Sequence, residues 1–128
     1  MPVNLPRWTG TAVVIAVSAL YVLGPPPPEG EAAGLGLDKV AHVAGFATIA
    51  AAWALAVTPR RLPLGWLALG VPLLLAGALE ILQSLRPERE TSFGDVAANL
   101  AGIALGVAAA WILRRRRRRV SGIGEAAE

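Results

Sequence analysis

The sequence predicts an all-α fold, an integral membrane four-helix bundle with both termini in the cytoplasm. Hydrophobic residues make up 55% of the 128 residues, and the mean hydropathy is +0.55. Four apolar stretches approach the roughly 20 residues that a helix needs to cross the hydrocarbon core. They lack the polar and apolar alternation of a barrel strand, and in lipid only helices and closed barrels satisfy their backbone groups. One small membrane domain is therefore expected, without disulfides or thiolate metal sites because cysteine is absent.

The first predicted span covers residues 8–23 and is the shortest. It has some features of a secretory signal, because Arg7 precedes an apolar stretch that ends in a turn-forming segment. A cleavage after Ala33 would require a small residue where Glu31 stands, so we expect an uncleaved anchor. The proline run 25–28 then predicts a stiff linker to the second span.

The other predicted spans cover residues 40–57, 62–85 and 96–113. Pro63 suits a helix start, whereas Pro72 falls in mid-span and predicts a kink. Small residues recur at every fourth position of the last span, at Gly94, Ala98, Gly102, Gly106 and Ala110. Such a stripe allows close helix packing, and we favour packing within the chain. A homodimer through Gly102 and Gly106 is the alternative.

The basic residues that flank the spans predict the orientation. Nine of them would lie on one side, namely Arg7, Arg60, Arg61 and Arg114 to Arg119, whereas only Lys39, Arg86 and Arg89 lie opposite. The positive-inside bias then places both termini in the cytoplasm and the loops 24–37 and 86–93 outside. We expect residues 114–128 to be a basic and then flexible tail. Its arginines would meet anionic membrane lipids, and no nucleic-acid partner is expected.

Polar side chains gather near the outer ends of three spans. They are Asp38 and His42, Glu80 and Gln83, and Asp95 and Asn99. Within each pair the spacing of three or four residues places both side chains on one helix face. Ionisable groups are costly to bury in a membrane, so these residues are the functional candidates.

Simpler roles are open for each of these residues. Asp38 suits a helix N-cap, and Ser92 with Asp95 forms the pattern of a capping box. Arg86 would pair with acidic residues in a solvated loop. The remaining polar side chains could hold the helices together by hydrogen bonds. A ligand site better explains so many ionisable groups in one layer, with Arg89 binding an anion through two hydrogen bonds.

The residues also match the pattern of a known family. Asp38, Lys39 and His42 form D-K-x-x-H, Glu80 and Gln83 follow, and Arg89, Asp95 and Asn99 form R-x(5)-D-x-x-x-N. Over about residues 38–106 the chain resembles the VanZ-like membrane proteins. One departure is Pro87-Glu88 before Arg89, where glycine is common in the family.

The resemblance implies a multi-pass protein of the bacterial cytoplasmic membrane. The founding member of the family is associated with low-level resistance to the glycopeptide teicoplanin. The resemblance leaves the biochemical activity open, and it does not imply resistance for every relative.

Three functions follow from the polar residues. We favour a site that binds an outer-leaflet lipid, a cell-wall precursor or an amphiphilic glycopeptide. Its candidate ligand-binding residues are Asp38, Lys39, His42, Glu80, Gln83, Arg89, Asp95 and Asn99. The alternative is a membrane enzyme that modifies a lipid-linked envelope substrate, with His42, Glu80 and Asp95 as acid-base candidates. Transport would need ionisable groups throughout the bilayer depth and is least favoured.

We expect no cofactor and no metal, because one imidazole without H-E-x-x-H spacing is a weak zinc pattern.

Overall fold

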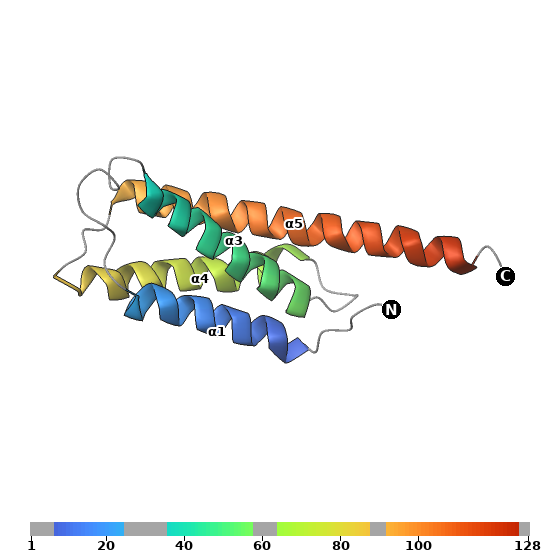
Figure 1. The fold of residues 1–128 in the computed structure, drawn as a ribbon, viewed down its shortest axis with the longest axis horizontal. Helices are drawn as coiled ribbons and strands as arrows, with labels where there is room; N and C mark the ends of the chain where they lie inside the picture. Colours follow the sequence, from blue (N-terminus) through green and yellow to red (C-terminus); the bar gives the residue numbers. More distant parts are fainter. Residues whose placement is uncertain (1–6, 25–35, 58–63, 88–91, 126–128) are drawn as a thin grey trace.

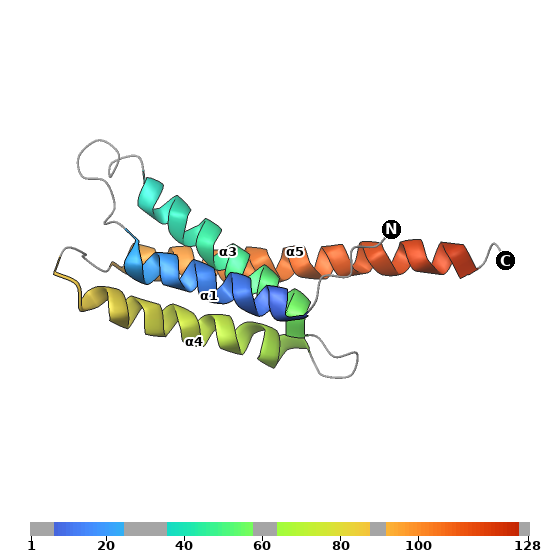
Figure 2. The same cartoon turned by 60° about the horizontal axis from the view of Figure 1, so that its bottom comes forward.

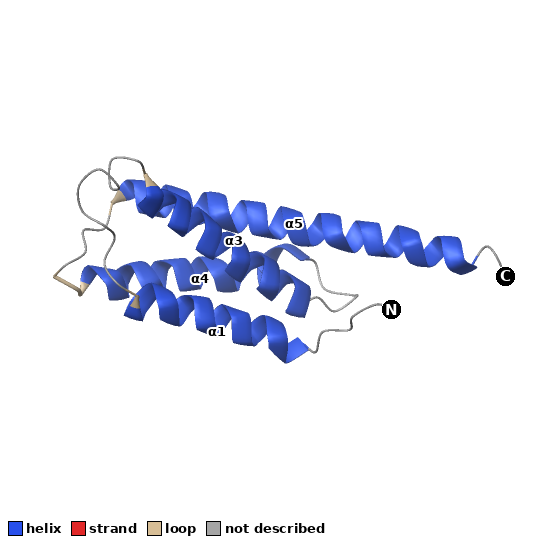
Figure 3. Ribbon diagram, viewed as in Figure 1, coloured by secondary structure: helices blue, strands red, loops and turns tan. Residues whose placement is uncertain are grey.

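The computed structural model describes residues 7–24, 36–57, 64–87 and 92–125. Within these ranges the chain forms four helices, labelled as in Figure 1: α1 (Arg7–Leu23), α3 (Leu37–Val57), α4 (Leu64–Ser84) and α5 (Phe93–Glu125). The same ranges contain no strand (Figure 3), so the predicted all-α class is confirmed. Predictions about the proline run 25–28, Arg60, Arg61, Pro63 and Arg89 lie outside the described residues.

Three of the helices are long and apolar enough to cross a membrane. The segments are Leu37–Ala56, Trp66–Ser84 and Phe93–Arg117, with mean hydropathies of 1.4, 1.7 and 2.0. The apolar part of α1, Trp8–Leu20, is shorter than these segments. Large hydrophobic side chains such as Trp66 and Leu74 are exposed on the outer surface. Such a surface fits a bilayer better than water, consistent with a membrane protein.

Helix α3 is the central element of the packing. It contacts each of the other three helices, most extensively α5. It lies beside α5 in Figure 1 and crosses α1 and α5 in Figure 2. Phe46 and Ile49 of α3 are almost completely buried, and they pack in one core cluster with Val14, Leu79 and Ile103 from the other three helices. This core joins all four helices.

The close approach of α5 to α3 depends on two glycines. A Cβ atom added at Gly102 would lie 3.0 Å from Phe46 Cβ, and one at Gly106 would lie 2.9 Å from Ala50 Cβ. Both would also meet backbone oxygens of α3. These glycines therefore serve packing within the chain, which was the favoured interpretation. A homodimer through the same glycines stays a prediction.

The start of α3 differs from the predicted boundary at residue 40. The helix begins at Leu37, directly after Gly36, whose positive φ of 68° is a conformation that glycine adopts without strain. Asp38 therefore lies in the first helical turn, and the alternative role as an N-cap is not the one that it takes. The capping box before α5 is confirmed, because Asp95 N donates to Ser92 Oγ (3.3 Å) and Ser92 N donates to Asp95 Oδ2 (2.9 Å).

Helix α5 extends well beyond its predicted end at residue 113. It continues through the arginine block to Glu125 and runs past the ends of the other helices (Figure 1). Arginine is a good helix former, so nothing in the block stops the helix. The predicted basic tail is therefore helical as far as Glu125, and its flexibility stays a prediction. The start of α1 and the end of α5 lie toward one end of the bundle, opposite the starts of α3 and α5.

Candidate functional site

A polar cluster lies where the starts of α3 and α5 meet the last turns of α4. We use this name for Asp38, Lys39 and His42 of α3, Glu80 of α4, and Asp95 and Asn99 of α5. His42, Asp95 and Asn99 are buried, with 5%, 4% and 3% of their surface exposed. Three helices of largely apolar sequence thus bring charged and hydrogen-bonding side chains together at one end of the bundle.

A chain of hydrogen bonds crosses this cluster from α3 to α4. Asn99 Nδ2 donates to Glu80 Oε2 over 3.3 Å, and Asn99 Oδ1 lies 2.7 Å from His42 Nδ1. Because the asparagine oxygen can only accept, the geometry assigns a proton to Nδ1 of His42. Asn99 thereby fixes both the ring orientation and the position of the glutamate.

Lys39 is the cationic partner of the two aspartates. Its ammonium forms an ion pair with Asp95 and another with Asp38 over 3.2 Å, and it also donates to Ser92 Oγ over 3.1 Å. Asp95 additionally accepts hydrogen bonds from the backbone and hydroxyl groups of Ser92. The buried Asp95 carboxylate is therefore held by one cation and by the capping box.

The arrangement of Asp38, His42 and Asp95 resembles the donor set of a metal site. His42 Nε2 lies 3.7 Å from Asp38 Oδ1 and 3.9 Å from Asp95 Oδ1, and the three residues offer ligand atoms within 4.8 Å of one another. However, the Lys39 ammonium already contacts both carboxylates. A metal ion would have to displace this internal cation, so the donor set fits a metal poorly.

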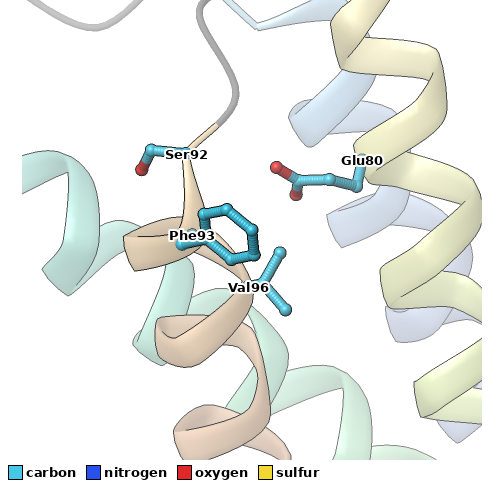
Figure 4. Close-up of a pocket in the computed structure, with 4 residues that line it drawn as sticks. All are labelled: Glu80, Ser92, Phe93 and Val96. Carbon is cyan, nitrogen blue, oxygen red and sulfur yellow. The ribbon is translucent and has the colours of Figure 1, made fainter.

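Glu80 differs from the other members because one of its oxygens has no hydrogen-bond partner among the described residues. Oε2 accepts from Asn99, whereas Oε1 is buried without a hydrogen-bond donor from the described residues. Its side chain lines a small opening with Ser92, Phe93 and Val96 (Figure 4). Gln83 is also buried on α4, with 4% exposure. Arg89, predicted to bind an anion here, lies outside the described residues.

Two arginines have structural contacts that the sequence analysis missed. Arg86 Nη1 donates to Gly24 O at the end of α1 over 3.1 Å, so this side chain is not simply solvated as predicted. Arg114 donates to the carbonyls of Ala54 and Leu55 near the end of α3. Both arginines donate to carbonyls at or near a helix end, where side-chain donors can supplement the backbone bonds. The contacts join segments far apart in sequence, and no local pattern indicates them.

The fold and the cluster define an all-α protein with three helices suited to a membrane and a partly buried polar cluster at one end of the bundle. No protein family, curated protein or solved structure matches the chain.

Proposed function

We propose that this protein is a membrane protein whose polar cluster binds the polar headgroup of an amphiphile. The observation that carries the proposal is the buried network of His42, Asn99 and Glu80 among helices of membrane-spanning character. Hydrogen bonds between membrane helices contribute on average only about 0.6 kcal/mol each. Helix association alone therefore gives little reason to gather so many ionisable groups in one layer.

The amphiphile in this proposal is an outer-leaflet lipid, a cell-wall precursor or a glycopeptide, in a bacterial cytoplasmic membrane. The resemblance to VanZ-like proteins motivates this choice, and glycopeptide resistance of the teicoplanin type is a consequence to be tested. The proposed orientation follows the positive-inside bias. In support, the arginines from Arg114 onward lie toward the opposite end of the bundle from the polar cluster.

Acid-base catalysis on a lipid-linked substrate is the second candidate function. It is favoured by the oriented imidazole of His42, whose Nδ1 is hydrogen-bonded to Asn99. A candidate nucleophile beside the cluster is the hydroxyl of Ser92, which donates to Asp95 and accepts from the Lys39 ammonium. A protonated lysine cannot activate this serine as a base, so we prefer binding to covalent chemistry.

Native mass spectrometry of the detergent-purified protein tests the proposal. We compare the wild type with Asp95→Asn, which removes the buried charge, and with Gly77→Ala, a control where an added Cβ meets nothing within 4 Å. The expected result is an amphiphile retained by the wild type and the control and lost by Asp95→Asn at unchanged helicity. Retention of no species, or equal retention by all three proteins, would contradict binding. Conversion of the retained species by the wild type would support the enzyme instead.

A further inference from the structure

The contact between α4 and α5 contains a lateral opening at the level of the polar cluster. We propose that an amphiphile enters here sideways from the bilayer, and that Glu80 accepts a hydrogen bond from a hydroxyl or ammonium group of its headgroup. This inference rests on the proposed binding function, because it names the entry path and the chemical class of the ligand.

The packing of α5 leaves room for such an entry. Helix α5 packs far more extensively against α3 than against α4. The two glycines Gly102 and Gly106 fit closely against the α3 backbone, with no comparable pair of close-fitting glycines on the described part of α4. An amphiphile that separates α4 from α5 therefore disrupts fewer contacts than one that separates α3 from α5.

The lining of the opening is itself amphiphilic. It has a volume of about 220 Å³, which suits a headgroup fragment better than a whole lipid. Figure 4 shows the Glu80 carboxylate of α4 on one side and Phe93 and Val96 of α5 on the other. Phe93 is 95% exposed and Val96 44% exposed. A headgroup at Glu80 would thus continue into an apolar chain that lies on these two side chains.

The charges around the opening favour a headgroup that carries a hydrogen-bond donor. The described cluster carries the carboxylates of Asp38, Glu80 and Asp95 against the single ammonium of Lys39, and Lys39 is already paired with both aspartates. Glu80 Oε1 still lacks a donor from the described residues. A buried acceptor without a donor is costly, and a headgroup hydroxyl or ammonium removes that cost.

Lipid competition tests the inference and separates the two donors. The purified protein is delipidated in detergent and offered phosphatidylethanolamine, phosphatidylglycerol and phosphatidylcholine with identical acyl chains, and occupancy is read by native mass spectrometry. Phosphatidylethanolamine carries an ammonium donor and phosphatidylglycerol carries hydroxyl donors, whereas the headgroup of phosphatidylcholine has no hydrogen-bond donor. We expect the wild type to prefer one or both donor lipids over phosphatidylcholine by about tenfold, as one hydrogen bond to a charged acceptor provides.

Two variants address the two parts of the inference. Glu80→Gln keeps the side-chain size and an acceptor for Asn99 but replaces Oε1 by a donor, so the preference should disappear. Val96→Trp fills the opening and should lower the occupancy by donor lipids. Ile112→Trp is its matched control, because Ile112 lies on α5 with a similar exposure of 47%.

Equal occupancy by the three lipids, a preference that survives Glu80→Gln, or full binding by Val96→Trp would each overturn the inference. The proposed function is tested separately by Asp95→Asn. If this variant loses the lipid while Glu80→Gln and Val96→Trp keep it, the polar cluster binds a headgroup by another path. Loss of lipid in Val96→Trp but not in Ile112→Trp supports lateral entry.

Discussion

Asn99 is the residue on which the hydrogen bonding of the cluster most depends. Its amide joins His42 and Glu80, and it is 97% buried. We expect Asn99→Leu to leave both partners without this bond and to lower the free energy of unfolding by about 1–3 kcal/mol. Reversible unfolding in mixed detergent micelles measures the change. Thr48→Val is the control, because the Thr48 hydroxyl donates to the carbonyl of Ala44 on its own helix. Equal losses of stability in both variants would contradict the bridging role.

Lys39 and Asp95 form the second test at the scale of residues. Removal of the lysine by Lys39→Met leaves the buried Asp95 carboxylate with its Ser92 hydrogen bonds but without its cation. Because the lysine is half-exposed, we expect the free energy of unfolding to fall by about 1–2 kcal/mol, less than for a fully buried ion pair. The double variant Lys39→Met/Asp95→Asn should recover most of the lost free energy of unfolding. Additive losses in a double-mutant cycle would show that the ion pair contributes nothing.

The sequence predicted well which polar residues lie together, but it did not predict their hydrogen-bond and ion-pair partners. Helical spacing placed His42 on the same face as Asp38, and Asn99 on the same face as Asp95, because that spacing is a local property. The pairing of His42 with Asn99 and of Lys39 with Asp95 depends on how α3 and α5 rotate toward each other. Lys39 was thus included in the predicted site, but its central ion pair with Asp95 was not foreseen.

Packing of α5 against α3 can be tested at the scale of helices. Gly106→Ala introduces a Cβ that lies 2.9 Å from Ala50 Cβ and closer still to a backbone oxygen, so α5 must move away from α3. We expect a net loss of about 1–3 kcal/mol from overpacking. Gly77→Ala on α4 meets nothing within 4 Å and should be neutral or stabilising by up to about 1 kcal/mol. The unfolding midpoints of the two variants and the wild type give the comparison. A Gly106→Ala variant as stable as the wild type would contradict the close packing of α5 against α3.

The arginine block divides into a structural residue and exposed ones. Arg114 donates to two carbonyls near the end of α3, whereas Arg116 is exposed on the projecting part of α5. We expect Arg114→Gln to lower the stability by about 1 kcal/mol and Arg116→Gln to leave it nearly unchanged. Thermal unfolding at two salt concentrations checks this, and equal effects of both substitutions would argue against the capping contact.

Helix ends were predicted less well than helix positions. The spans were expected from hydropathy, which records where apolar residues cease and not where the helix ends. Helix α5 therefore passes its predicted end at residue 113, since arginines are compatible with a helix outside the apolar segment. Helix α3 begins at Leu37, three residues before the apolar span predicted from residue 40, because hydropathy excludes the polar first turn with Asp38 and Lys39.

The proposed orientation of the whole molecule rests on the distribution of charge and can be tested directly. The chain has no cysteine, so Pro87→Cys and Glu125→Cys each introduce a single thiol at opposite ends of the bundle. With the basic end inside, a membrane-impermeant maleimide added to intact cells should label Pro87→Cys only. Glu125→Cys should be labelled after the membrane is opened. The reverse pattern would contradict the proposed orientation.

The central claim for the molecule is that its polar cluster holds a ligand and does more than join helices. The most direct measurement is the unfolding midpoint of wild type and Asp95→Asn, each with a bacterial polar-lipid extract and with phosphatidylcholine alone. A ligand that binds only the folded state adds about 2.7 kcal/mol at a hundredfold excess over its Kd. We expect the extract to raise the midpoint of the wild type well above that in phosphatidylcholine, and to leave Asp95→Asn unshifted. An equal shift in both proteins would show that the cluster joins helices without holding a ligand.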